Sequence, residues 1–146
     1  MKDRRVLKAA LAAIIAALIF GSCRYNNAER RIRRTVLNHQ DELTEIAVNT
    51  LSGSKEDYKG ILNEGIFESE DGYRIVQFYV TGFGLVPSAS YEGFYYSPDD
   101  IPVSYQNAGY DLEQTAEDTW EWSDDTDNGG ITKRITENWY YYKAWF

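Results

Sequence analysis

The chain has 146 residues, with 23 acidic and 15 basic side chains and a formal net charge of −8. This length fits one small domain, and a content of 43% hydrophobic and 15% aromatic residues excludes wholesale disorder. Residues 1–34 carry nine basic and two acidic groups, whereas residues 35–146 carry six basic and 21 acidic ones, so the body repels polyanions and no nucleic acid is expected as a partner.

An export segment is predicted at the N-terminus. Four basic residues among the first eight precede an unbroken apolar run, Ala9–Phe20, which is followed by Gly21 and Ser22. This order of charged, apolar and small residues is that of a secretory signal. The run covers about 18 Å as a helix and falls short of a hydrocarbon core of about 30 Å. We expect residues 1–23 to be a signal or lipoprotein-type export segment, and residues 24–146 to be a single extracytoplasmic domain.

The single cysteine, Cys23, closes this segment. Residues 18–23, Leu-Ile-Phe-Gly-Ser-Cys, resemble the lipobox of bacterial lipoproteins, with Phe20 where that motif prefers Leu and Gly21 where it prefers Ala, Ser or Thr. The resemblance implies cleavage before Cys23, lipid attachment to it, and a lipid-anchored protein on the extracytoplasmic side of the cell membrane. A retained signal-anchor helix and cleavage without lipidation stay open as alternatives. One cysteine excludes an intrachain disulfide in each case.

Five arginines lie between residues 24 and 34, directly after this segment. They weaken the positive-inside bias that favours a signal-anchor helix. In a lipoprotein they would lie against anionic head groups, where each charge contributes up to about 1 kcal/mol. A solvated basic start of a helix is the other interpretation.

One long amphipathic helix is predicted over residues 27–51. Asn26 and a glutamate three residues later have the form of a capping box, and Ile32, Val36, Leu43 and Ala47 recur at helical spacing until Ser-Gly at residues 52–53 ends the pattern. The single histidine, at residue 39, falls on this apolar side, which favours a packing role over catalysis.

Antiparallel strands follow. Asp71-Gly72 predicts a two-residue hairpin loop that opposes Phe67 to Val76, and the second strand continues as a central strand. A tyrosine-rich third strand covers residues 91–97 and ends at Pro98 in a type I turn. Residues 101–117 are interpreted as a loop with one short strand.

A last hairpin is centred on Asn128-Gly129, which opposes Trp122 to Ile135. The strand after the loop runs to the final residue, and so many large rings at a terminus require that it docks on the domain. This register divides the large apolar side chains between two faces, one with Trp120, Trp122, Ile135, Trp139, Tyr141 and Trp145 and the other with Tyr140, Tyr142 and Phe146.

These elements predict an α+β fold in which the long helix packs on a curved antiparallel sheet of about five strands. The second sheet face is either closed by residues 101–117 or left as an exposed platform. As a platform, the flat rings of one face could stack on the sugar rings of a cell-wall glycan, whereas packing in the core or an interface with another protein are the alternatives. The candidate ligand-binding residues are Trp120, Trp139, Tyr141 and Trp145.

Motifs for catalysis or metal binding are scarce. The sequence has no nucleophile elbow, Walker loop, dinucleotide glycine pattern or zinc cluster, so we expect no cofactor, no metal site and no catalytic residues. Convergence of carboxylates could still give a hydrolase, and the candidate residues are Asp99, Asp100, Asp118 and Glu121. Residues 124–129 resemble the start of a calcium loop, but its twelfth position is Ile135 instead of glutamate.

The function expected from the sequence is a binding or structural role at the bacterial cell envelope, by a small extracytoplasmic domain anchored to the membrane through its N-terminus. An envelope protein or a glycan is the expected partner. A cell-wall glycan-binding module and a small carboxylate-dependent hydrolase are the alternatives.

Overall fold

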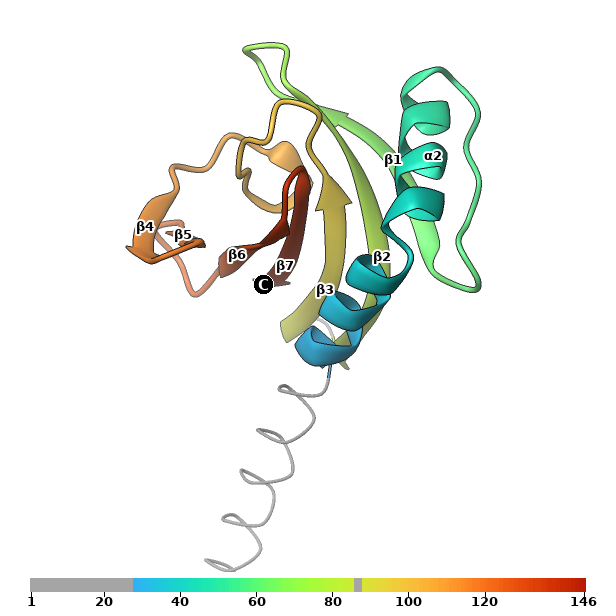
Figure 1. Ribbon diagram of the computed structural model, residues 1–146. Helices are drawn as coiled ribbons and strands as arrows, with labels where there is room; N and C mark the ends of the chain where they lie inside the picture. Colours follow the sequence, from blue (N-terminus) through green and yellow to red (C-terminus); the bar gives the residue numbers. More distant parts are fainter. Residues whose placement is uncertain (1–27, 86–87) are drawn as a thin grey trace, which may run out of the picture.

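The protein is described by a computed structural model that covers residues 28–85 and 88–146. Its centre is one seven-stranded antiparallel sheet with the order β1-β2-β3-β7-β6-β5-β4, covered on one face by helices (Figure 1). The export segment and Cys23 lie outside the described residues. No helix within the described ranges is long and apolar enough to cross a membrane.

Two antiparallel meanders build the sheet. The first contains β1 and two long strands, and the second contains four strands, of which β7 pairs with β3 and joins the two meanders. The bounds are β1 Leu62–Glu68, β2 Arg74–Leu85, β3 Ser88–Tyr96, β4 Glu113–Ala116, β5 Thr119–Ser123, β6 Gly129–Thr136 and β7 Trp139–Trp145. This fold is mostly β, with two short helices, and it contradicts the predicted long helix on about five strands.

The helical layer is broken at His39. Residues 28–38 form one helix and α2, Gln40–Leu51, forms the second, with His39 between them in a non-helical conformation (φ −132°, ψ 29°). Asn38 and His39 are weak helix formers, so a break at this position costs little. Val36 and Leu43 keep the seven-residue spacing of a continuous apolar stripe across the break, and the sequence pattern therefore does not reveal it.

The strand count was wrong because two tight turns were missed. The run after Asn128 is divided at Glu137-Asn138 into β6 and β7, and Glu117-Asp118 separates β4 from β5. Asn138 and Asp118 have positive φ angles of 65° and 54°. Asn and Asp tolerate this conformation, but without a following glycine they are weak hairpin signals.

The register of both predicted hairpins was also wrong. Phe67 opposes Ile75 and not Val76, because the first hairpin has a longer loop. Trp122 opposes Gly130 and not Ile135, because residues 124–128 form a five-residue loop. An odd shift moves every side chain of a strand to the other face of the sheet. The expected grouping of the C-terminal rings on one face is therefore wrong as well.

The main core lies between the helices and the sheet. Ile32 and Val36 of the first helix and Leu43 and Ala47 of α2 are buried. From the sheet, Trp139 enters this core completely buried. Its other buried members are Tyr58, Val76, Phe78, Phe94, Ile135 and Tyr141.

The opposite face of the sheet is covered by the connection between β3 and β4, which contains the short 3-10 helix η1, Tyr105–Asn107. Val103 is buried there and its N–H donates to the hydroxyl of Tyr95 at 2.8 Å. Asn107 Nδ2 donates to the carbonyl of Tyr73 at 2.8 Å. Of the two possibilities for this face, closure by the loop is thus the one observed over the centre of the sheet.

The C-terminus is docked, as its rings required. Phe146 and Ala89 exchange two backbone hydrogen bonds of 2.9 Å, which extend the pairing of β7 with β3 to the last residue. The end of β2, the start of β3 and the C-terminus therefore lie together at the end of the sheet near the start of the first helix (Figure 1).

Candidate functional site

The four candidate ligand-binding residues do not share one exposed surface. Trp139 and Tyr141 are fully buried beneath the helices. Trp120 lies on the other face, beside the ring of Tyr140. Trp145, 38% exposed, lies at the end of β7. The four residues thus lie on different faces of the sheet, and only two of them, Trp120 and Trp145, are partly exposed.

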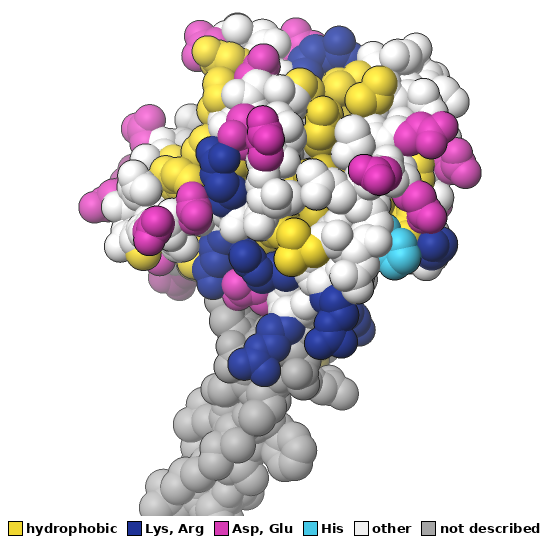
Figure 2. Space-filling model, viewed as in Figure 1, with side chains coloured by type: hydrophobic (Ala, Val, Ile, Leu, Met, Phe, Trp, Pro, Cys, Tyr) yellow, Lys and Arg dark blue, Asp and Glu magenta, His cyan; other side chains and the backbone are white. Residues whose placement is uncertain are grey.

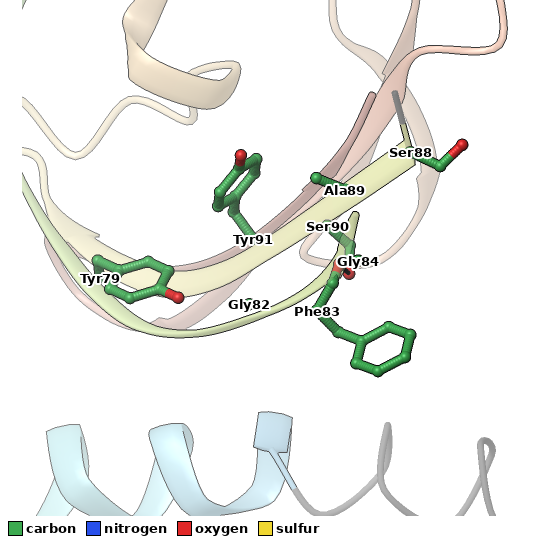
Figure 3. A pocket seen from close by; sticks show the side chains of 8 residues that line it. All are labelled: Tyr79, Gly82, Phe83, Gly84, Ser88, Ala89, Ser90 and Tyr91. Atoms are coloured by element: carbon green, nitrogen blue, oxygen red, sulfur yellow. Dashed lines mark hydrogen bonds between the residues drawn. The ribbon is translucent and has the colours of Figure 1, made fainter. Parts of the chain in front are cut away.

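A hollow with partly accessible rings lies instead at the end of β2 and the start of β3, where residues 79–85 and 88–91 form what we call the arm (Figure 3). It has a volume of about 780 Å³. Tyr79 and Tyr91 are half-buried in it, whereas Phe83 is 83% exposed and points away from them toward the helix side. The residues that line the hollow are Tyr79, Gly82, Phe83, Gly84, Ser88, Ala89, Ser90 and Tyr91.

Two sequence features form this arm. Val80 is the extra residue of a bulge in the pairing of β2 with β3, and it reverses which side chains of β2 face each side of the sheet. Gly82 then leaves room for the ring of Tyr79, because a Cβ at Gly82 would lie 2.9 Å from the Tyr79 hydroxyl. The bulge and the glycine together place a tyrosine ring over bare backbone at the floor of the hollow.

A cluster of tyrosines continues from the hollow along the loop-covered face. Tyr91 stacks on Tyr105, with 6.0 Å between ring centroids, and Tyr105 contacts Tyr142 at 5.5 Å. Glu64 from β1 lies behind them, where its Oε2 accepts hydrogen bonds from Gln77 Nε2 at 2.7 Å and from the Tyr142 hydroxyl at 3.3 Å. The cluster is thus aromatic and rich in hydroxyl groups, with one carboxylate among them.

This environment keeps the phenols neutral. Burial, followed by the negative charge of Glu64, raises the pKa of Tyr105 to about 12. The same two causes raise the pKa of Tyr142 well above its usual value. Neutral hydroxyl groups both donate and accept hydrogen bonds, which is the chemistry that recognises polar, uncharged ligands.

Two of the four candidate carboxylates converge, but on an arginine. Arg134 Nη1 lies 2.6 Å from Asp100 Oδ2, and Arg134 Nε lies 3.6 Å from Asp118 Oδ1. Glu121 instead accepts a hydrogen bond from Thr115, and Asp99 is exposed in the turn after β3. The guanidinium thus occupies the space between the two carboxylates that converge.

Asp100 has the properties of a structural anion. Burial alone would raise the pKa of Asp100, but the N–H of Asn138, the Arg134 guanidinium and the Tyr140 hydroxyl outweigh it and hold this pKa below its usual value. A general acid in a glycosidase needs a raised pKa. The group instead fixes the turn after β3 to the turn between β6 and β7, because Asp100 Oδ1 accepts from Asn138 N at 2.8 Å.

The acidic loop after β5 organises itself. Asp124 accepts hydrogen bonds from Thr126 N at 2.7 Å and from Asn128 Nδ2 at 2.9 Å. Hydrogen bonds from Thr126, and then from Asn128, lower the pKa of Asp124. Among residues 28–85 and 88–146, no group of three His, Cys, Asp or Glu side chains could hold a metal ion.

His39 takes a packing position at the break between the helices. Its ring is tilted against Tyr58, with 5.8 Å between centroids, and its Nδ1 lies 3.9 Å from a carboxylate oxygen of Glu42.

Sequence reasoning missed the tyrosines of the arm. Tyr79 lies on the strand face where polar and apolar residues are mixed, and Tyr91 was interpreted only as the start of a strand. The available signal was Gly82 and Gly84 late in an apolar strand, since such glycines mark bulges or places where another group approaches the backbone.

Comparison of the chain with family models, curated proteins and solved structures gave no match.

Proposed function

We propose that this chain is a membrane-anchored, extracytoplasmic binding domain of the bacterial cell envelope, with the hollow of the β2–β3 arm as its ligand site. The observation that carries the proposal is the contrast in burial. Trp139, Tyr140, Tyr141 and Tyr142 are buried, whereas the rings of the arm stay accessible around a defined hollow. Partly accessible rings beside a hollow are the composition typical of a ligand site.

The N-terminal sequence supports the anchor. A basic start, the apolar run and Cys23 are the parts of a lipoprotein signal, and the described domain begins at residue 28, five residues after Cys23. A lipid anchor on Cys23 would therefore hold the domain directly at the membrane, without a long linker.

The intact mass of the chain extracted from membranes tests the anchor. We expect the mass of residues 23–146 plus acyl chains, and we expect Cys23→Ala to lose both the acyl mass and the membrane fractionation. A full-length mass that does not respond to Cys23→Ala would refute lipidation and favour a retained signal-anchor helix.

A glycan is the ligand class that the hollow favours. Tyr79 and Tyr91 offer flat rings for stacking on sugar rings, and their hydroxyls can pair with sugar hydroxyls. The chemistry is the one expected for a cell-wall glycan-binding module, although the residues differ from the four candidates taken from the sequence.

Co-sedimentation of the detergent-solubilised chain with purified cell-wall glycan tests this ligand class. Tyr91→Ala should weaken binding at least tenfold, while Tyr91→Phe should keep the ring stacking and lose part of the affinity. The matched control is Tyr73→Ala, which removes a 43% exposed tyrosine far from the arm. Equal binding by Tyr91→Ala and Tyr73→Ala, with both variants folded, would refute the hollow as a glycan site.

A further inference from the structure

The end of the domain that carries the arm also gathers positive charge. Arg30, Arg31 and Arg34 are exposed in the first helix. None of the three forms an ion pair or side-chain hydrogen bond with another residue of the described ranges, whereas Arg33 donates to the carbonyl of Arg134. Figure 2 shows Lys and Arg side chains gathered at this end, while most Asp and Glu side chains in the view lie farther away.

Two exposed rings accompany these arginines. Phe83 opposes Ser90 on β3, and Ser90 opposes Trp145 on β7, so the two rings lie in one cross-strand row and on the same face of the sheet. Figure 3 shows Phe83 pointing to the side on which the first helix begins. Arg31 lines a small cleft on the helix side of the sheet together with Val80, which lies three residues before Phe83 on β2.

We propose that this end of the domain is a docking surface for an anionic lipid bilayer, with Arg30, Arg31 and Arg34 on the head groups and Phe83 and Trp145 in the interfacial layer. The inference rests on the proposed function, because it takes the N-terminus as the membrane anchor. Aromatic side chains with arginines beside them are the composition found where proteins meet the membrane interface.

The length of the connection and the charge of the body agree with this occupant. The five Cα-to-Cα steps from Cys23 to residue 28, the first described residue, span at most about 17 Å, so an anchor on Cys23 keeps this end within reach of the head groups. Screening at physiological salt limits attraction to about 8 Å, which requires direct contact. The strongly acidic body, residues 35–146, is repelled by the same surface and turns away from it.

Quenching of tryptophan emission by brominated lipids tests the surface with the native chain. The full chain, extracted from membranes, is reconstituted into vesicles of phosphatidylcholine with or without phosphatidylglycerol, each carrying brominated lipid. We expect at least twofold stronger quenching in the phosphatidylglycerol vesicles, and Trp145→Phe should remove most of the difference, because Trp139 and Trp122 are buried and Trp120 lies on the opposite face of the sheet.

Charge reversal at two sites provides the matched comparison. Arg30→Glu/Arg34→Glu should lower the quenching in phosphatidylglycerol vesicles to that in phosphatidylcholine. Lys55→Glu/Arg74→Glu reverses two exposed charges elsewhere, with Arg74 at the far end of the helical layer, where its Nη2 donates to the carbonyl of Leu51. This control should leave the quenching unchanged.

The outcomes separate the two proposals. Vesicle co-sedimentation without quenching of Trp145, or quenching that Arg30→Glu/Arg34→Glu does not reduce, would overturn the docking surface and leave the anchor intact. A wild-type chain that does not co-sediment with either vesicle would overturn the proposed membrane anchor, and the docking surface with it.

Discussion

Replacement of Trp139 by alanine should destabilise the domain more than any change at the other three tryptophans. The indole is fully buried between the helices and the sheet. It packs against the rings of Tyr96, Phe94 and Phe78 at centroid distances of 5.1, 5.7 and 6.1 Å. Its Nε1 also donates to Thr44 Oγ1 of α2 at 3.3 Å, which ties the helix to the sheet.

The expected cost follows from that environment. Truncation of a buried Trp to alanine lowers the free energy of unfolding by about 3–5 kcal/mol, out of a total of about 5–15 kcal/mol for an ordinary domain. For a domain of this size, about 4 °C of midpoint is lost per kcal/mol, so the thermal midpoint of Trp139→Ala should fall by about 12–20 °C. Near-ultraviolet circular dichroism of the full chain in mild detergent measures this midpoint.

Trp120→Ala is the control, since Trp120 is half-buried at one side of the opposite face. It should cost less than half as much as Trp139→Ala. If Trp139→Ala instead stayed within about 1 kcal/mol of the wild type, or matched Trp120→Ala, the assignment of Trp139 to the core would be refuted. A ligand-contacting role for Trp139 would then regain support.

Three further predictions concern backbone packing and titration. Gly93→Ala should prevent the chain from folding, because the added Cβ would overlap a backbone carbonyl of β2 and lie 2.7 Å from the Tyr142 hydroxyl. A normal yield of folded chain from membranes, with a normal thermal midpoint, would contradict this. Asp100→Asn should lower the midpoint at neutral pH, and the deficit should shrink as pH falls below about 4, because the lowered pKa of Asp100 confers stability that is fully present above its ordinary pKa of 3.8 and is lost as pH falls through the lowered value. A deficit that is constant over a series of midpoints from pH 3 to 7 would disprove it. Glu64→Gln should lower the pKa of Tyr105 from about 12 toward, but not to, 10, because burial is the larger cause; ultraviolet titration of the phenols compared with Tyr105→Phe measures the shift, and an unchanged titration curve would count against the charge of Glu64.

Local signals in the sequence located much of the secondary structure. The turn at Asp71-Gly72, the turn at Pro98 and the apolar stripe of Ile32 and Val36 all occur where the pattern predicted them. Each depends on residues close together in sequence, such as a glycine that accepts positive φ or a proline with a fixed φ. Features of this kind can be predicted without knowledge of the partner strand.

Register and face could not be predicted in the same way, because they depend on loop length. Trp122 pairs with Gly130 only because Asp124 organises a five-residue loop through its hydrogen bonds to Thr126 and Asn128. Asn128-Gly129 is a stronger sequence signal for a two-residue turn than anything in the five-residue loop. Side-chain hydrogen bonds nevertheless favour the longer loop, and rules based on the residues at the turn positions do not include them. One wrong loop was enough to group Trp120 with Trp139.

The dependence of side-chain orientation on strand pairing also explains why the candidate site lies at other residues than the sequence predicted. Whether a ring is core or surface is decided by which face of the sheet the helices cover, and the bulge at Val80 changes that face in the middle of β2. Tyr79 and Phe83 would face the same side in an unbroken strand, but the bulge points Phe83 toward the first helix and leaves Tyr79 at the hollow. A single unpaired residue thus places the proposed glycan site and the proposed membrane-docking surface on opposite faces of one arm. Deletion of Val80 would remove the bulge but leave Tyr79 and Phe83 three residues apart in a regular strand, so the two rings should stay on opposite faces and both proposed interactions should persist. Tyr91→Ala should instead weaken only the glycan interaction, and Arg30→Glu/Arg34→Glu only the membrane interaction.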